Sequence, residues 1–446
     1  MNPAVIERSG PVALQRSDLH ASLGDTTLEA VNFLNEVIDR FPKAISFAPG
    51  APNPQFFDGL DVSKYIDRYV VHLAQEQGLT LAQVRRRLYQ YGASRGQICD
   101  LVADVLRVDE GIVVSAQAVV ITVGAQEAML LALRALRAGP NDMLAVVTPC
   151  FMGIVGSARL LEMQIVAIDE GTTGIDLDQM RAACQIARAE GRRIRAVYVA
   201  PDFANPSGAL MDLATRHALL ELAEIEDFLV LEDSTYGFTA GRGRELPALK
   251  KLDRGQRVIY LGTFSKVCLP GTRVGFVVAD QPVVGAANGR LLADDLAALK
   301  TMVTVNTSPI CQAIIGGILL DHGGSLKDVA AAKASVYQQN LQCLLTALGH
   351  HIECRDGVSW NVPLGGFFVR MRLPVIVDDA LVEISAREFG VLWMPMVHFY
   401  LGGVSSNELR LSCSYLTPSQ IDEGAGRLGA FVDYICRKRA LADPGT

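Results

Sequence analysis

Seven short runs rich in β-branched and other apolar residues recur between residues 118 and 278, and helical segments separate most of them. The runs lie at 118–123, 143–148, 164–168, 194–199, 228–232, 257–261 and 273–278. The intervening segments, such as 126–137 and 176–190, carry apolar residues at helical spacing. Strands that alternate with helices form parallel sheets whose two faces are both covered. The sequence therefore predicts an α/β fold whose large domain has a mostly parallel, seven-stranded sheet between helices.

The pattern changes beyond residue 309. Helices are expected at 311–320, 326–348, 378–389 and 418–437, and strands at 366–371, 391–394 and 409–412. This order predicts a small α+β C-terminal domain. Because 446 residues exceed one ordinary core of about 150 residues, we expect three parts. These are an N-terminal arm and substrate-covering segment (1–60), a large domain (61–320) and a small C-terminal domain (321–446).

Composition excludes several classes of protein. With 50% hydrophobic and 20% charged residues, the chain has enough apolar material to fold. The net charge of −7, without a basic stretch, argues against a nucleic-acid partner. The most apolar runs fall well short of the roughly 20 residues that span a membrane. The chain has nine cysteines without a C-x-x-C pair, and its start shows no signal peptide; both features predict a cytoplasmic location. The sequence also lacks the residue spacing typical of metal ligands.

The loops that follow the predicted strands contain the candidate functional residues, because ligands of open parallel sheets bind at the carboxyl ends of strands. Gly124, Ala125 and Gln126 follow the run 118–123 and open a helix, where free N–H groups favour a phosphate. A glycine at such a turn can also serve geometry alone. Asn205, in Asn-Pro-Ser-Gly, either builds a turn or presents its amide to a ligand.

Two further loops carry charged side chains. Asp233 ends an apolar strand, where a carboxylate shielded from water can face a cation, and Tyr236 follows three residues later. Lys266 follows the run 257–261, and a desolvated lysine is neutral enough to form a Schiff base. Ser265 and Arg273 lie close to it in the sequence and suit a phosphate.

This set of groups is what a pyridoxal phosphate site needs. Asn205-Pro-Ser-Gly, Asp233-Ser-Thr-Tyr236, Ser265-Lys266 with Arg273, and Arg410 together resemble the fold-type I pyridoxal phosphate enzymes of the class I/II aminotransferase group. Within this group the chain is most similar to aminoadipate and kynurenine aminotransferases and to aminotransferase-like regulators. The resemblance extends over about residues 44–437.

The resemblance implies a role for each matching residue. Lys266 would form the Schiff base and move the proton between substrate and cofactor, Asp233 would hold the pyridine nitrogen protonated, and Tyr236 would bind the cofactor oxygen O3′. Arg410 would bind the substrate α-carboxylate. The other implied cofactor contacts are Gly124, Ala125, Gln126, Phe151, Asn205, Thr263, Ser265 and Arg273. The resemblance also implies a homodimer with shared active sites, in which Tyr91 of the second subunit contacts the cofactor. Asn205 and Gly50 would also contact the substrate.

The function implied by the resemblance is transfer of an amino group from an L-amino acid to a 2-oxo acid through Lys266. The alternative is a pyridoxal phosphate enzyme of specialised metabolite biosynthesis that uses the same carbanion for β/γ-elimination, replacement or cyclisation. A regulator is disfavoured because no basic helix-turn-helix segment precedes residue 44. Three features depart from the family pattern: Ala125 replaces a hydroxyl residue, Arg95 is expected near the pocket, and 401–407 reads as a lid or a surface loop.

Overall fold

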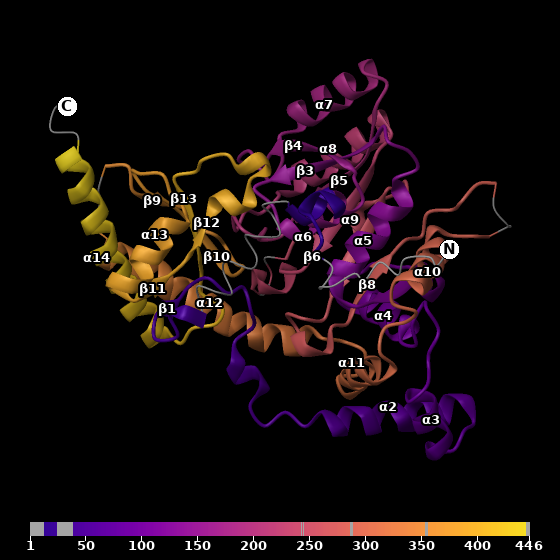
Figure 1. Cartoon of the computed structure of the whole chain (residues 1–446). Helices are drawn as coiled ribbons and strands as arrows, with labels where there is room; N and C mark the ends of the chain where they lie inside the picture. Colours follow the sequence, from indigo (N-terminus) through magenta and orange to yellow (C-terminus); the bar gives the residue numbers. More distant parts are fainter. Residues whose placement is uncertain are drawn as a thin grey trace, which may run out of the picture.

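The computed structural model describes residues 13–24, 39–241, 243, 245–285, 289–352 and 356–442. Its largest sheet has seven strands in the order β2-β8-β7-β6-β5-β3-β4 (Figure 1). The strands are β2 (Val119–Thr122), β3 (Asp142–Thr148), β4 (Gln164–Asp169), β5 (Arg193–Val199), β6 (Leu229–Ser234), β7 (Val258–Thr263) and β8 (Gly275–Val278). Only β8 runs antiparallel to its neighbours β2 and β7. The predicted seven-stranded, mostly parallel sheet is confirmed.

Helices cover both faces of this sheet because alternate strand residues are apolar on both sides. On β7, Ile259 belongs to the core beneath α5 and α6, whereas Tyr260 belongs to the core on the opposite face. The helices of this part are α2 (Val62–Gln77), α3 (Leu81–Leu88), α4 (Cys99–Val105), α5 (Gly124–Leu136), α6 (Met152–Leu160), α7 (Leu177–Ala189), α8 (Leu213–Glu226), α9 (Leu249–Leu252), α10 (Leu292–Val303) and α11 (Pro309–Asp321).

A smaller sheet forms the C-terminal part, with strand order β12-β13-β10-β9. Its strands are β9 (Ser359–Trp360), β10 (Phe368–Arg372), β12 (Met394–Pro395) and β13 (Glu408–Ser412), and α13 (Asp379–Ile384) and α14 (Pro418–Ala442) accompany them. The N-terminal segment joins this part, because β1 (Ile45–Ser46) pairs in parallel with β11 (Val391–Leu392). The predicted small α+β unit is confirmed.

Two predicted elements differ in detail. The single strand expected at 391–394 is two short strands, β11 and β12, that belong to different sheets. Trp393 separates them, and its buried indole Nε1 donates a hydrogen bond of 2.9 Å to Ser385 Oγ. The helix expected at 378–389 consists of α13 followed by a π-helical turn (Ser385–Phe389). Ser385 Oγ in turn donates to the Val391 carbonyl at 2.8 Å, so the π-helical turn is bonded to both β11 and Trp393.

Helix α12 (Lys327–His351) runs from the side of α11 to the small sheet (Figure 1). Its Asn340 Nδ2 donates to the carbonyl oxygens of Cys413 and Leu416 at 3.0 and 2.9 Å, so the helix is fixed to the end of β13. The predicted boundaries after residues 60 and 320 remain predictions. Within the described ranges, no helix combines the length and the apolar character needed to cross a membrane.

Candidate active site

Lys266 lies in the loop directly after β7, as the sequence predicts. Its Nζ donates a hydrogen bond of 2.8 Å to the carbonyl oxygen of Gly50, which belongs to the N-terminal segment that follows β1. Burial, reinforced by the charges of Arg273 and Arg410, lowers the pKa of Lys266 to about 8, and Asp233 opposes this shift. A substantial fraction of the amine is therefore neutral near physiological pH, the state in which nitrogen is a nucleophile.

Asp233 lies on β6, beside the strand that leads to Lys266, and is 7% exposed. Its carboxylate accepts hydrogen bonds from the Tyr198 hydroxyl at 2.6 Å and from Thr235 Oγ1 at 2.5 Å. Burial raises the pKa of Asp233, whereas these two donors and the charge of Lys266 oppose the rise. Asp233 is therefore a buried, oriented acceptor that can hold a proton on a partner nitrogen.

Tyr198 is a site residue that the sequence analysis missed. It is the last residue but one of β5, the strand next to β6, and its side chain is buried. The available signal was a single phenol near the end of an apolar strand, seven residues before Asn205. The strand order that places it beside Asp233 is not visible in the sequence.

The predicted phosphate-binding residues converge at the start of α5. A Cβ on Gly124 would lie 2.5 Å from Arg273 Nη2, and a Cβ on Gly275 would lie 2.8 Å from the backbone nitrogen of Ala125. Arg273 Nη1 donates to Ser265 Oγ at 3.4 Å. The Arg273 guanidinium, the Ser265 hydroxyl and the N–H groups at the start of α5 thus lie in one small region. Only glycine at positions 124 and 275 leaves room for these groups to come so close together.

Thr263 and Gln126, two of the predicted cofactor contacts, have protein partners of their own. Thr263 Oγ1 accepts a hydrogen bond of 3.1 Å from the Ser265 backbone nitrogen, which fixes the loop before Lys266. The Gln126 side-chain amide donates to the Gly153 carbonyl at 2.8 Å and to Ser157 Oγ at 3.0 Å. The Gln126 side chain therefore lies against α6, and its backbone N–H is the group left for a phosphate.

Arg410 lies on β13 and is 4% exposed. Its Nη1 donates to Asn205 Oδ1 at 2.7 Å, and its Nη2 donates to the carbonyl oxygen of Ala48. The guanidinium carbon is 4.5 Å from the centre of the Phe368 ring and 4.9 Å from that of Phe399. Burial lowers the pKa of Arg410 to about 10, so the group stays charged at neutral pH, and its buried Nε has no hydrogen-bond partner among the described residues.

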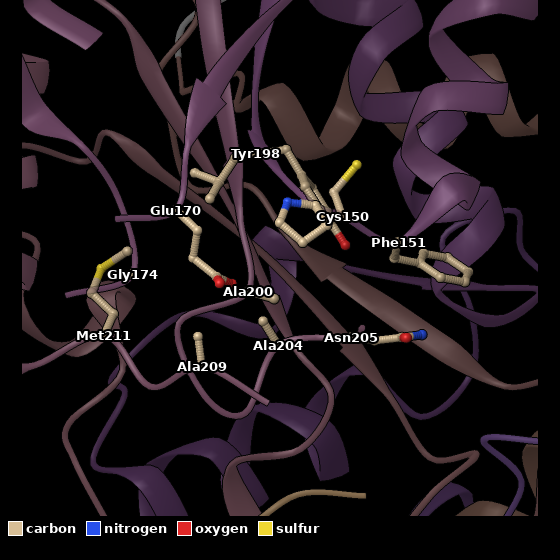
Figure 2. Close-up of a pocket in the computed structure, with 12 residues that line it drawn as sticks. Cys150, Phe151, Glu170, Gly174, Tyr198, Ala200, Ala204, Asn205, Ala209 and Met211 are labelled. Carbon is tan, nitrogen blue, oxygen red and sulfur yellow. The ribbon is translucent and has the colours of Figure 1, made fainter. Parts of the chain in front are cut away.

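Aromatic residues complete the site. Tyr236 is buried, with its ring edge-on to Phe367 and Phe368 at centroid distances of 5.0 and 5.5 Å. Phe151, which directly precedes α6, is partly exposed. Figure 2 shows Phe151 and Asn205 extending to the same side of a small cavity whose lining includes both residues. The structure therefore places Phe151 and Asn205, two of the predicted cofactor contacts, at the same cavity.

Arg95 does not reach the pocket, contrary to the expectation from the sequence. Its guanidinium binds the Asp294 carboxylate on α10 and the carbonyl oxygen of Gln117, so its charge and donors are used to join structural segments.

Tyr91 is 85% exposed, and its predicted action on a second subunit stays a prediction. The segment 401–407 begins with Leu401 packed on the core and includes the exposed Val404. Among the described residues, no cluster of His, Cys, Asp and Glu side chains has the arrangement of a metal site.

Known proteins share this fold and sequence pattern. The sequence model of aminotransferase class I and II matches residues 60–428. An (S)-3,5-dihydroxyphenylglycine transaminase from Amycolatopsis orientalis is 47% identical over 419 residues, which cover 94% of each chain. The crystal structure of a kynurenine aminotransferase from Pyrococcus horikoshii has a TM-score of 0.77 and 28% identity, with 91% of this chain and 94% of that chain covered. A multiple substrate aminotransferase from Thermococcus profundus has a TM-score of 0.79 and 27% identity, with 95% and 99% covered.

Proposed function

The chain belongs to the class I and II aminotransferase family and is a pyridoxal phosphate-dependent transferase, and from this premise we propose the residues that carry its reaction. The observation that carries the proposal is that one amine, one carboxylate and one guanidinium, from Lys266, Asp233 and Arg410, occupy one buried site. The Lys266 amine would hold the cofactor through its aldehyde carbon, the Asp233 carboxylate would keep the pyridine nitrogen protonated, and the Arg410 guanidinium would bind the substrate α-carboxylate. The bound cofactor supplies an electron sink that stabilises negative charge at the substrate Cα.

The donor set of the site supports binding of the cofactor phosphate. The start of α5 offers backbone N–H groups, and Arg273 with Ser265 adds a charged fork and a hydroxyl. Ala125 offers no hydroxyl, so its backbone N–H is the donor there. Asn205 and Tyr236 are assigned to the cofactor O3′, and Phe151 to the face of the ring.

Each remaining step rests on groups of this chain. Arg410 orients the substrate by its α-carboxylate, and the Asn205 amide fixes the guanidinium in turn. The Lys266 amine would move the proton between the substrate Cα and the cofactor carbon C4′. The lowered pKa of Lys266, to about 8, suits an amine that must both accept and give up a proton.

We further propose that the amino donor carries an aromatic ring close to Cα, as in arylglycines. The similarity to an (S)-3,5-dihydroxyphenylglycine transaminase over 94% of both chains supports this substrate class. The amino acceptor would be a 2-oxo acid that binds Arg410 in the same way.

A homodimer with shared sites is the assembly we propose. Large exposed apolar side chains gather on two adjacent segments: Tyr89, Tyr91, Met302, Val303 and Ile310. The segments are neighbours, because a Cβ on Gly92 would lie 3.5 Å from Pro309 Cγ. An exposed apolar face of this kind is typical of a protein interface. We also propose a cytoplasmic location, which the eight free cysteines of the described residues support.

The test is to incubate purified holoenzyme with (S)-3,5-dihydroxyphenylglycine alone and follow conversion of the cofactor to its amino form by absorbance. Borohydride reduction of the holoenzyme, followed by peptide mapping, is expected to find the cofactor on Lys266. A label on another lysine contradicts the assignment. Loss of ammonia without formation of the amino form of the cofactor would favour the elimination chemistry instead.

A further inference from the structure

Two arginines lie side by side on the small sheet and reach toward the large sheet. Arg370 on β10 is the direct cross-strand partner of Arg410 on β13, so both side chains leave the same face of the sheet. Arg410 binds Asn205, and Arg370 Nη1 lies 3.7 Å from Glu170 Oε2. The Arg410–Asn205 contact belongs to the proposed active site, whereas the Arg370–Glu170 contact involves no residue assigned to that site.

Glu170 is a buried carboxylate at the carboxyl end of β4. It is 6% exposed, and its Oε1 accepts a hydrogen bond from Ser207 Oγ. Ser207 belongs to the same tight turn as Asn205. In Figure 2, Glu170 extends toward Ala200 and lines the small cavity that Asn205 also lines. Glu170 therefore joins the turn to Arg370 on the small sheet.

The turn that contains Asn205 and Ser207 is held from the small sheet as well. Asn361 Nδ2 donates to the Ser207 carbonyl at 2.7 Å, and Asn361 Oδ1 accepts from the Arg370 backbone nitrogen at 2.7 Å. A Cβ on Gly208 would lie 2.6 Å from the Phe368 carbonyl oxygen, so the turn lies directly against β10. Glu170 and Asn361 therefore both hold this turn, through the side chain and the carbonyl group of Ser207.

We propose that Glu170 is a positioning residue that holds the Asn205 turn against Arg410 and thereby sets the affinity of the site for the substrate α-carboxylate. The proposal rests on the proposed role of Arg410. Asn205 is a neutral acceptor, so it orients the guanidinium without neutralising the charge that the substrate needs. If the turn moves, the Arg410 fork loses its orientation, and two-point binding of a carboxylate weakens.

The charge of Glu170 responds to pH near neutrality. Burial raises the pKa of Glu170 to about 7, Ser207 and Arg370 oppose this rise, and the nearby Glu408 adds to it. Glu408 itself accepts from the Tyr400 hydroxyl at 2.6 Å and from Arg372 Nη2 at 3.0 Å. The ionised form of Glu170 attracts Arg370 and accepts from Ser207. Carboxylate affinity is therefore expected to rise as pH increases through about 7, because the bound state favours the ionised form.

The experiment measures binding of 3-phenylpropionate, a carboxylate without an amino group, to the holoenzyme by isothermal titration calorimetry between pH 6 and 8. We expect Glu170→Gln to weaken binding roughly 3- to 30-fold at the alkaline end, the usual range for residues that act through a neighbour. The variant should also lose the increase in affinity through neutrality, while its cofactor absorbance stays that of the wild type. Glu226→Gln is the matched control, since Glu226 is also shielded from solvent and paired with an arginine, Arg188, at 2.9 Å, but lies at the end of α8.

Two further variants keep the proposal testable if Glu170→Gln does not fold. Ser207→Ala and Arg370→Gln each remove one of the two contacts of Glu170 and should weaken binding in the same direction. Unchanged affinity and unchanged pH dependence in the folded variants overturn the positioning role. If Arg410→Lys binds 3-phenylpropionate as the wild type does, the proposed carboxylate site fails as well. If only Arg410→Lys weakens binding, the inference about Glu170 alone is wrong.

Discussion

Tyr198 donates a hydrogen bond of 2.6 Å to the Asp233 carboxylate, across the boundary between β5 and β6. Asp233 has only one other side-chain donor in the described structure, Thr235. The two donors leave the carboxylate oriented and favour its ionised form against the effect of burial. Tyr198 therefore strengthens the ability of Asp233 to keep the pyridine nitrogen of a bound cofactor protonated.

Tyr198→Phe should accordingly lower the rate of the first half-reaction without removing the cofactor. A hydrogen bond to a charged group contributes about 1.5 to 3 kcal/mol, and its loss raises the pKa of Asp233. We expect slower conversion of the cofactor to its amino form in stopped-flow absorbance, together with a lower free energy of unfolding.

Tyr260→Phe is the matched control for Tyr198→Phe. Tyr260 is also a buried strand tyrosine bonded to a carboxylate, because its hydroxyl lies 2.8 Å from both oxygens of Glu110. Its replacement should reduce stability similarly and leave the half-reaction rate unchanged. Equal rate losses in both variants would show that Tyr198 acts through stability alone.

The lowered pKa of Lys266 predicts how the rate of cofactor uptake by the apoenzyme depends on pH. The neutral amine attacks the cofactor aldehyde, and the fraction of neutral amine grows as pH rises through about 8. The rate of cofactor uptake, followed by visible absorbance, should therefore increase with pH and level off above this value. Lys266→Ala is expected to bind the cofactor without the covalent bond and to show no turnover. A rate of uptake that is independent of pH between 6.5 and 9 would contradict the lowered pKa.

The strand ends were predictable because alternation and β-branching are local signals. Lys266 and Asp233 each follow or end an apolar run, and the structure places them on neighbouring strands. Tyr198 and Glu170 were missed because their roles depend on the order of strands in the sheet, which no local pattern contains. Arg95 was misplaced for the same reason, since its partner Asp294 is 199 residues away in the sequence.

The shared-site homodimer predicts complementation between two impaired chains. A dimer that mixes Lys266→Ala with Tyr91→Phe chains contains one site with both native residues if Tyr91 acts on the second subunit. We expect activity to reappear after subunit exchange, and exchange is to be verified with a tagged chain. Tyr89→Phe, on the same exposed face, is the control, and it should retain its activity without mixing. The absence of recovery after proven exchange would count against shared sites.

Arg410→Lys tests the carboxylate clamp. A carboxylate in a water-poor pocket needs a planar partner with two donors, and a lysine does not reproduce this fork. Arg410 Nε has no partner in the described part of the chain, so donor capacity remains after Asn205 and Ala48 are bound. We expect a loss of about 2 to 5 kcal/mol in substrate and transition-state binding, the range for breaking a buried charge pair.

The measurement is kcat/KM for several amino acids, with cofactor content as the internal control. If kcat/KM is unchanged, or if the variant loses its cofactor, Arg410 is not the carboxylate clamp. Arg95 is not a substitute in that case, because Asp294 and the Gln117 carbonyl already bind it, so ordinary α-amino acid transamination would lose its main structural support.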